Sequence, residues 1–180
     1  MILKKVTLDN KSDLEFIEKL YIESFPRYER RPILQMHQLL EIEERFNMYL
    51  LETEDNTRIG FVTYWMLDTF IFLDHFAISS EQRSGGYGKK AVEKLIQQTD
   101  LPLVGEIELT GASDMASRRA KFYEKQGFKI WDLPYEQPPF EEEYDAVPMH
   151  IITYRDVGFP ANFETIRDTI YSEVYKKRYK

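Results

Sequence analysis

Residues 70–97 read FIFLDHFAISSEQRSGGYGKKAVEKLIQ, and this stretch decides the fold. Its first part, 70–78, is rich in β-branched and aromatic residues and predicts a strand. A polar run then leads to three closely spaced glycines, Gly85, Gly86 and Gly88, which predict a tight turn. Beyond the turn, apolar residues recur at three- and four-residue spacing, as on one buried face of a helix. The stretch therefore predicts a strand, a glycine turn and a helix in succession.

Such a turn predicts a binding site for an anion. The start of a helix leaves backbone N–H groups unpaired and carries a partial positive charge, and glycines lack the Cβ atoms that would hold off a phosphate. Two common phosphate motifs do not fit. A Walker A loop would need glycine in place of Arg83 and serine or threonine in place of Lys90, and a dinucleotide fingerprint would need a third spaced glycine.

The composition limits the class of protein and the partners that can be expected. The 180 residues are 43% hydrophobic, enough for the core of one globular domain. A net charge of -7 gives no broad basic surface, so we expect no nucleic-acid partner. The absence of cysteine excludes a thiol nucleophile and fits a cytoplasmic protein. The three histidines lack metal-ligand spacing and no apolar run approaches a membrane span, so we expect neither a metal nor a membrane.

The elements around this stretch predict an α/β protein with a mixed sheet. Other strands are predicted at 2–8, 48–51, 58–66, 103–109, 128–131 and 149–154, and helices at 12–24, 32–46, 115–125 and 162–177. Short turns join the strands between 48 and 78, which predicts an antiparallel meander. The strand at 103–109 follows a crossover helix, which predicts parallel pairing with 70–78. The Pro-rich, acidic segment 133–147 is predicted as a long connection.

Two motifs together resemble one family. RSGGYG at 83–88 resembles the Gln/Arg-x-x-Gly-x-Gly/Ala signature of the GNAT acetyltransferase superfamily, and RRAKFYEKQGF at 118–128 resembles its helix ending in Leu/Phe-Tyr-x-Lys-x-Gly-Phe. The resemblance covers about 2–154 and implies a GNAT-like mixed sheet with a parallel pair of central strands. We therefore expect an acetyltransferase domain at 1–155 and an added C-terminal helix at 156–180, packed on the same domain or forming a homodimer.

The resemblance implies acetyl-CoA as co-substrate. Backbone groups on the strand before the glycine turn would hold the pantetheine arm, and those of the turn would hold the pyrophosphate. The implied cofactor-binding residues are Phe76, Ala77, Ile78, Arg83, Ser84, Gly85, Gly86, Tyr87 and Gly88. Ala116 departs from the family, because many members have an asparagine there that helps to hold the pantetheine. Ser113, Asp114 or Ser117 could substitute for it.

The resemblance also implies the catalytic residues. Tyr123 falls at the tyrosine that many members use as a general acid toward the CoA sulfur, and a tyrosine with a pKa of about 10 can donate its proton at neutral pH. Asp74 stands where many members carry a glutamate base, and its shorter side chain could need a bridging water. Glu106 and Glu108, on the next strand, are further carboxylates near the cleft.

The alternation of side chains along a strand divides residues 72–78 between two faces. Strict alternation puts one set on the face of Asp74 and the other on the face of His75. The first set is Phe72, Asp74, Phe76 and Ile78, and the second is Leu73, His75 and Ala77. His75, on the face opposite to the proposed base, is then expected to be an interior histidine.

The acceptor site in this superfamily lies between the first two helices and the connection of the last two strands. Here these segments are oppositely charged: 26–32 holds three arginines, Arg27, Arg30 and Arg31, and 135–144 holds four glutamates. An amino acid-like or zwitterionic amine would suit both, or the two segments pair with each other.

The resulting hypothesis is an N-acetyltransferase that acts on the primary amine of a small molecule. Without a cysteine to carry an acyl group, we expect direct attack in a ternary complex. A CoA-binding sensor or interaction module that has lost the chemistry is the rival hypothesis, favoured by Asp74 and Ala116. Thioester hydrolysis is a third alternative.

Overall fold

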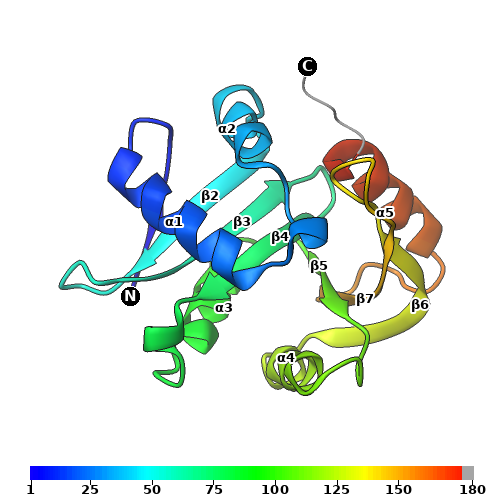
Figure 1. Cartoon of the computed structure of the whole chain (residues 1–180). Coiled ribbons are helices and arrows are strands. Elements are labelled where there is room, and N and C mark those ends of the chain that lie inside the picture. Colours follow the sequence, from blue (N-terminus) through cyan, green and yellow to red (C-terminus); the bar gives the residue numbers. More distant parts are fainter. Residues whose placement is uncertain (176–180) are drawn as a thin grey trace.

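A computed structural model describes residues 1–175 of the chain (Figure 1). The strands are β1 (Ile2–Lys5), β2 (Phe46–Glu52), β3 (Arg58–Met66), β4 (Ile71–Ile78), β5 (Leu103–Glu108), β6 (Lys129–Gln137) and β7 (Val147–Tyr154). The helices are α1 (Lys11–Ser24), α2 (Ile33–Ile42), α3 (Tyr87–Gln97), α4 (Asp114–Lys125) and α5 (Phe163–Ile170). A π-helical turn, Tyr171–Tyr175, continues α5, and short 3-10 turns occur at Arg27–Glu29 and Ser80–Gln82.

The strands form one sheet in the order β1-β2-β3-β4-β5-β7-β6. Neighbours from β1 to β4 are antiparallel, β4 and β5 are parallel, and β7 pairs antiparallel with both β5 and β6. The predicted α/β fold, with an antiparallel meander followed by a parallel pair, is confirmed. No helix within residues 1–175 is long and apolar enough to cross a membrane.

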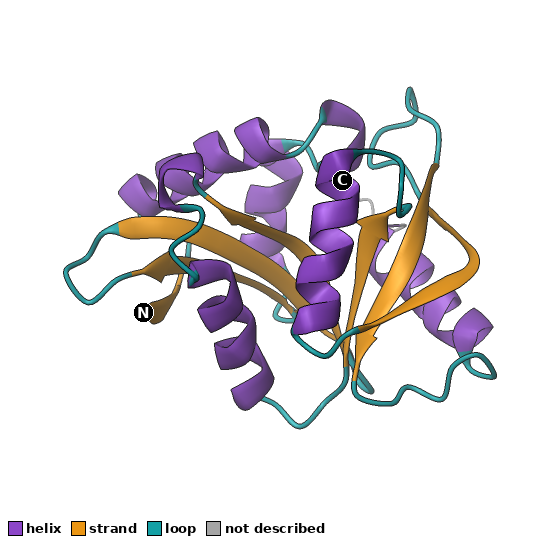
Figure 2. Cartoon of the chain, turned by 90° about the horizontal axis from the view of Figure 1, so that it is seen from below, coloured by secondary structure: helices purple, strands orange, loops and turns teal. Residues whose placement is uncertain are grey.

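The parallel pair is short. β4 and β5 pair only from Ile71 with Leu103 to Leu73 with Gly105. Beyond that point β4 runs on to Ile78 and β5 to Glu108 without pairing to each other. The strands of the sheet therefore spread apart from the middle of the molecule (Figure 2).

Helices cover both faces of the sheet. On one face, α1, α2 and α5 pack against a core that includes Ile17, Leu39 and Ile170, all almost completely buried. On the other face, α3 and α4 pack against a second core, to which they contribute Val92 and Ala120. The four residues predicted to form the apolar face of the C-terminal helix, Phe163, Ile166, Ile170 and Val174, are all buried in the first core. That prediction is confirmed as far as Tyr175; its end at residue 177 lies outside the described residues.

The prediction of a long connection at 133–147 is wrong for its first part, because β6 continues to Gln137. Pairing of β6 with β7 is interrupted between Trp131 and Tyr135, and Pro134 lies within this interruption. β6 is the edge strand of the sheet, where the missing N–H of a proline is tolerated. The longer strand places the Tyr135 side chain in the first core.

The alternation expected along β4 is also wrong, because the strand contains a bulge. Thr63 of β3 pairs with His75, but the next residue, Tyr64, pairs with Leu73, so Asp74 is an extra residue on β4. A bulge shifts every later side chain of the strand to the other face.

The consequence of the bulge is visible in the packing. Phe72 and Ala77 belong to the core under α1, α2 and α5, whereas Leu73 and Phe76 pack in the core under α3 and α4. Asp74 therefore does not share a face with Phe76, as strict alternation would require.

We predict that the C-terminal helix contributes to the stability of the whole fold. Ile170→Ala should lower the free energy of unfolding by about 3 kcal/mol, because Ile170 is fully buried and its loss leaves a cavity. Glu164→Ala, on the exposed side of the same helix, is the control and should change it little. Urea denaturation measures both. Equal, small effects would show that the helix does not share the core of the sheet.

Candidate active site

A cleft of about 500 Å³ opens where β4 and β5 part. Its walls come from the unpaired ends of β4 and β5, the glycine turn, α4 and the end of α1. The end of one helix and two separated strands thus meet around one cavity.

The glycine turn leads directly into α3. Gly86 has a left-handed backbone with φ 73°, a conformation that glycine adopts without strain, and it precedes the first helical residue, Tyr87. No side chain caps this helix, and the first backbone bond of the helix runs from the Lys90 N–H to the Gly86 carbonyl. The N–H groups of residues 87–89 precede that bond, so they point out of the helix end without a helical partner. This is the geometry of an anion site.

Two residues of the turn line the cleft. The Arg83 Nε–H donates to the Ile78 carbonyl at 3.2 Å, which folds the turn back onto the end of β4. Gly88 lies against the ring of Phe122 on α4, and a Cβ atom there would make an ordinary contact of 3.4 Å with that ring. The remaining residues of the predicted motif, 84–87, form the turn outside the cavity lining.

Phe76, Ala77 and Ile78 all line the cleft, but their backbone groups differ in direction. The Ser79 N–H donates to the Ile59 carbonyl on β3. Since backbone groups alternate along a strand, those of Ala77 also face β3, and those of Phe76 and Ile78 face the gap toward β5. Phe76 and Ile78 can therefore offer backbone hydrogen bonds to a molecule in the cleft.

Asp74 is a buried, ion-paired carboxylate with a side chain only 2% exposed. Arg31 Nε, Trp65 Nε1 and His75 Nδ1 each lie 3.4 Å from its oxygens. Burial alone would raise the pKa of Asp74, but the charges of Arg31 and His75 outweigh it and hold that pKa well below its usual range. A carboxylate held in this way is a poor proton acceptor.

Glu106 is the second carboxylate of the cleft, and its surroundings are different. The Tyr135 hydroxyl donates to Oε1, and the Tyr175 hydroxyl donates to Oε2 at 2.6 Å. Burial raises the pKa of Glu106 to about 7; Asp74 adds to this rise, and the two tyrosine hydroxyls and His75 oppose it. A group with a pKa near neutral is suited to accept a proton at neutral pH.

Tyr123 lines the cleft from α4 and is 8% exposed. Burial raises its pKa to about 12, and nearby Glu108 adds to the rise while Arg119 opposes it. Within residues 1–175, no group hydrogen-bonds to its hydroxyl. The phenol therefore keeps its proton at neutral pH and can donate it into the cleft.

The other polar groups predicted near the cleft have partners. Glu108 forms an ion pair with Arg119. His75 is buried as predicted, and its Nε2 lies 3.1 Å from the Glu29 carbonyl and 3.4 Å from the Tyr21 hydroxyl. The predicted opposite face is wrong, because the bulge places His75 beside Asp74 in the lining of the cleft.

Ser113, one of the residues suggested as a substitute for the family's asparagine at position 116, has a structural partner. Ser113 Oγ accepts a hydrogen bond from the Ala116 N–H and so caps α4. Of the three residues suggested as substitutes for the missing asparagine, Ser113 therefore already has a structural role.

The two charged segments of the predicted acceptor site contact each other. Arg27 forms an ion pair with Glu141, and the Arg31 guanidinium lies 4.4 Å from the centroid of the Phe140 ring. Of the two alternatives for these segments, direct pairing is thus realised for Arg27.

Sequence reasoning missed the two tyrosines that hydrogen-bond Glu106. Tyr135 was expected in a loop, and only the recognition of an edge strand through Pro134 would have placed it on the sheet. Tyr175 follows the buried Val174 in the C-terminal helix, and no local pattern points to a partner 69 residues away.

Residues 14–128, more than half of the chain, match the family model described as "Acetyltransferase (GNAT) family". The chain belongs to this family, and the resemblance found in its sequence is confirmed. The fold and the cleft agree with this assignment.

Individual relatives give the same result. A solved structure titled "Putative acetyltransferase from GNAT family from Bacteroides thetaiotaomicron" superposes with a TM-score of 0.92 at 32% identity, covering 99% of this chain and 100% of that one. "Putative acetyltransferase YjbC" of Bacillus subtilis (strain 168) is 30% identical over 117 residues, which is 64% of this chain and 57% of that protein. The match thus spans little more than half of the curated relative.

More distant structures share the fold. An aminoglycoside 6'-N-acetyltransferase complexed with coenzyme A superposes with a TM-score of 0.60 at 15% identity, over 86% of this chain and 96% of that one. A spermidine N-acetyltransferase from Vibrio cholerae has a TM-score of 0.62 at 12% identity, over 85% and 92%. At these identities the likeness concerns the fold alone.

We predict that Arg31 is needed to keep Asp74 buried. Arg31→Met should lower the free energy of unfolding at pH 7 by about 3 kcal/mol, because it leaves a buried carboxylate without its cation. Adding Asp74→Asn should recover part of this loss, since the uncompensated charge is then gone. Urea denaturation of the single and double variants measures the effect.

The pH dependence provides the control. Because the folded pKa of Asp74 lies below its ordinary value of 3.8, the contribution of the pair is present above that pH and is lost on acidification. The difference in the free energy of unfolding between wild type and Arg31→Met should therefore decrease as the pH falls below 3.8. A stability difference that does not change with pH would mean that lost packing, and not the charge pair, explains the effect.

Proposed function

We propose that this protein transfers the acetyl group of acetyl-CoA to the primary amine of a small molecule by direct attack in a ternary complex. The observation that carries the proposal is the cleft between β4 and β5. It brings together the uncapped N-terminus of α3, the Glu106 carboxyl with a pKa of about 7, and the protonated hydroxyl of Tyr123.

Acetyl-CoA would lie with its pyrophosphate at the start of α3 and its pantetheine arm in the gap between the strands. The free N–H groups of residues 87–89 and the glycines before them suit the pyrophosphate. The gap-facing backbone groups of Phe76 and Ile78 suit the amides of the arm.

Glu106 and Tyr123 then supply the two proton transfers. Glu106 takes a proton from the acceptor ammonium, and the freed amine attacks the thioester carbonyl. As the carbon–sulfur bond breaks, the Tyr123 hydroxyl gives its proton to the leaving thiolate, and the phenolate regains a proton as the acylated nitrogen loses its second one through solvent. Asp74, although it occupies the family's usual base position, is held ionised by Arg31 and is the weaker base in this scheme.

For the acceptor we propose an amino acid-like or zwitterionic amine. Arg27 and Arg31 form ion pairs with Glu141 and Asp74, whereas Arg30 forms none within residues 1–175, and each of the three keeps one buried nitrogen without a hydrogen-bond partner. Arg30 is therefore the arginine of this segment best able to meet a carboxylate. Solved structures with this fold include N-acetyltransferases named for spermidine and for aminoglycosides, so both amines belong in the acceptor screen.

A CoA-binding sensor without catalysis is the second proposal. The observations that favour it are Ala116 at the family's asparagine position and Asp74 locked in an ion pair. Both proposals require CoA binding, and only the enzyme requires release of thiol that depends on an amine.

We predict that CoA binds at the glycine turn. Gly86→Val should weaken binding at least tenfold, because a β-branched residue is strained at positive φ and its side chain enters the cradle. Gly111→Val is the matched control, since Gly111 also has a positive φ and open space around it but lies outside the turn. Calorimetric titration measures both; absence of wild-type binding at millimolar CoA would exclude both proposals.

We predict that Tyr123→Phe lowers kcat roughly 100-fold while CoA affinity stays unchanged, because only proton donation to the thiolate is lost. Tyr154→Phe, whose ring packs outside the cleft against Phe128, is the control. Thiol release is followed with acetyl-CoA and a panel of free amino acids, spermidine and an aminoglycoside. Unchanged turnover would remove Tyr123 as the acid, and CoA binding without amine-dependent release would favour the sensor.

A further inference from the structure

The C-terminal turn, Tyr171–Tyr175, reaches the candidate active site although it lies outside the residues that match the family model. Its last residue, Tyr175, donates a hydrogen bond of 2.6 Å to Glu106 Oε2. The other carboxylate oxygen is taken by Tyr135 of β6. Both oxygens of the proposed base are thus held by hydroxyl groups from segments that follow the matched region.

We propose that Tyr175 is a positioning residue for catalysis: its hydroxyl holds the Glu106 carboxylate in a single orientation toward the cleft. The inference rests on the proposed function, in which Glu106 is the base. It gives the C-terminal extension a role in the reaction besides its role in packing.

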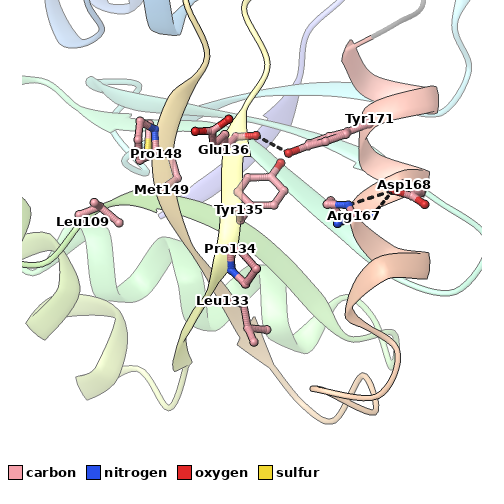
Figure 3. A pocket seen from close by; sticks show the side chains of 10 residues that line it. All are labelled: Leu109, Leu133, Pro134, Tyr135, Glu136, Pro148, Met149, Arg167, Asp168 and Tyr171. Carbon is pink, nitrogen blue, oxygen red and sulfur yellow. Dashed lines mark hydrogen bonds and ion pairs between the residues drawn. The ribbon is translucent and has the colours of Figure 1, made fainter.

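Three polar contacts hold the turn in place. The Val174 carbonyl accepts a hydrogen bond of 3.2 Å from Arg31 Nη1, and Glu173 forms an ion pair of 2.9 Å with Arg45 Nη1. The Tyr171 hydroxyl donates to the Glu136 carbonyl on β6 at 2.6 Å (Figure 3). A segment anchored in this way presents the Tyr175 side chain in one position.

The Tyr175 ring is fixed as well. Its centroid lies 5.0 Å from that of Phe140 and 6.5 Å from that of Phe72. Phe140 in turn carries the Arg31 guanidinium on its face. These apolar contacts do not involve the hydroxyl, so a phenylalanine at position 175 should keep the packing and lose only the hydrogen bond.

The hydrogen bond also affects the proton affinity of Glu106. Burial raises the pKa of this carboxyl, and the Tyr175 and Tyr135 hydroxyls lower it. The charged groups that act on it from β4 are Asp74, which raises the pKa, and His75, which lowers it. The Tyr175 ring packs against the first core, and desolvation raises its own pKa well above 10.0, so it remains a proton donor across the working range.

The direct test is the titration of Glu106 in the full-length protein, followed by the NMR signal of its ¹³C-labelled carboxyl. In wild type the midpoint should lie near pH 7, as the pKa of about 7 requires. In Tyr175→Phe it should move to higher pH by roughly one unit, the size expected for one lost hydrogen bond to a charged group. Ser172→Ala is the matched control, because it removes from the same turn a hydroxyl that donates to the Thr169 carbonyl instead.

Kinetics then separates the inference from the proposed function. In Tyr175→Phe, the acidic limb of the kcat/KM profile should move to higher pH by the same amount, with an unchanged KM for acetyl-CoA. An unmoved midpoint, or an equal shift in Ser172→Ala, overturns the positioning role while Glu106 remains the base. Full activity of Glu106→Gln overturns the base assignment itself, and with it any catalytic role of Tyr175.

Discussion

The end of pairing between β4 and β5 after Leu73 and Gly105 is the constraint on which the site depends. Two parallel strands that separate leave backbone N–H and C=O groups without partners, and such groups need other hydrogen bonds or water. The same separation makes room for a cleft and leaves the Glu106 side chain at its wall. The cavity, the free backbone edge and the candidate base therefore follow from a single break in the sheet.

Two carboxylates beside this break differ because their partners differ. Asp74 faces a guanidinium and stays ionised, whereas Glu106 faces neutral hydroxyl groups in a buried place and has a pKa near neutral. Neighbouring acids with separated pKa values are a common basis for acid–base catalysis. The bulge at Asp74 contributes to this division, because it shifts the following residue, His75, so that its ring lies beside the Asp74 carboxylate.

The parts of the molecule that the sequence predicted well are those with local causes. The glycine turn needs a left-handed residue at Gly86, and the apolar face of α5 repeats every three or four residues, so both leave a pattern in the chain. The faces of β4 could not be predicted, because a bulge depends on the register with β3. The Glu106 contacts span 29 and 69 residues, and no local rule relates such distant positions.

The position of these long-range contacts bears on how one fold can serve different acceptors. The family match includes Glu106 but ends at residue 128, before both of the tyrosines that hold it. The side of the cleft proposed to bind CoA, by contrast, is built by the glycine turn and α4, which both lie within the match. The residues that set the environment of the proposed base therefore lie beyond the region that the family model describes. Differences in acceptor chemistry between this protein and its relatives should therefore originate in β6 and in the turn that ends at Tyr175.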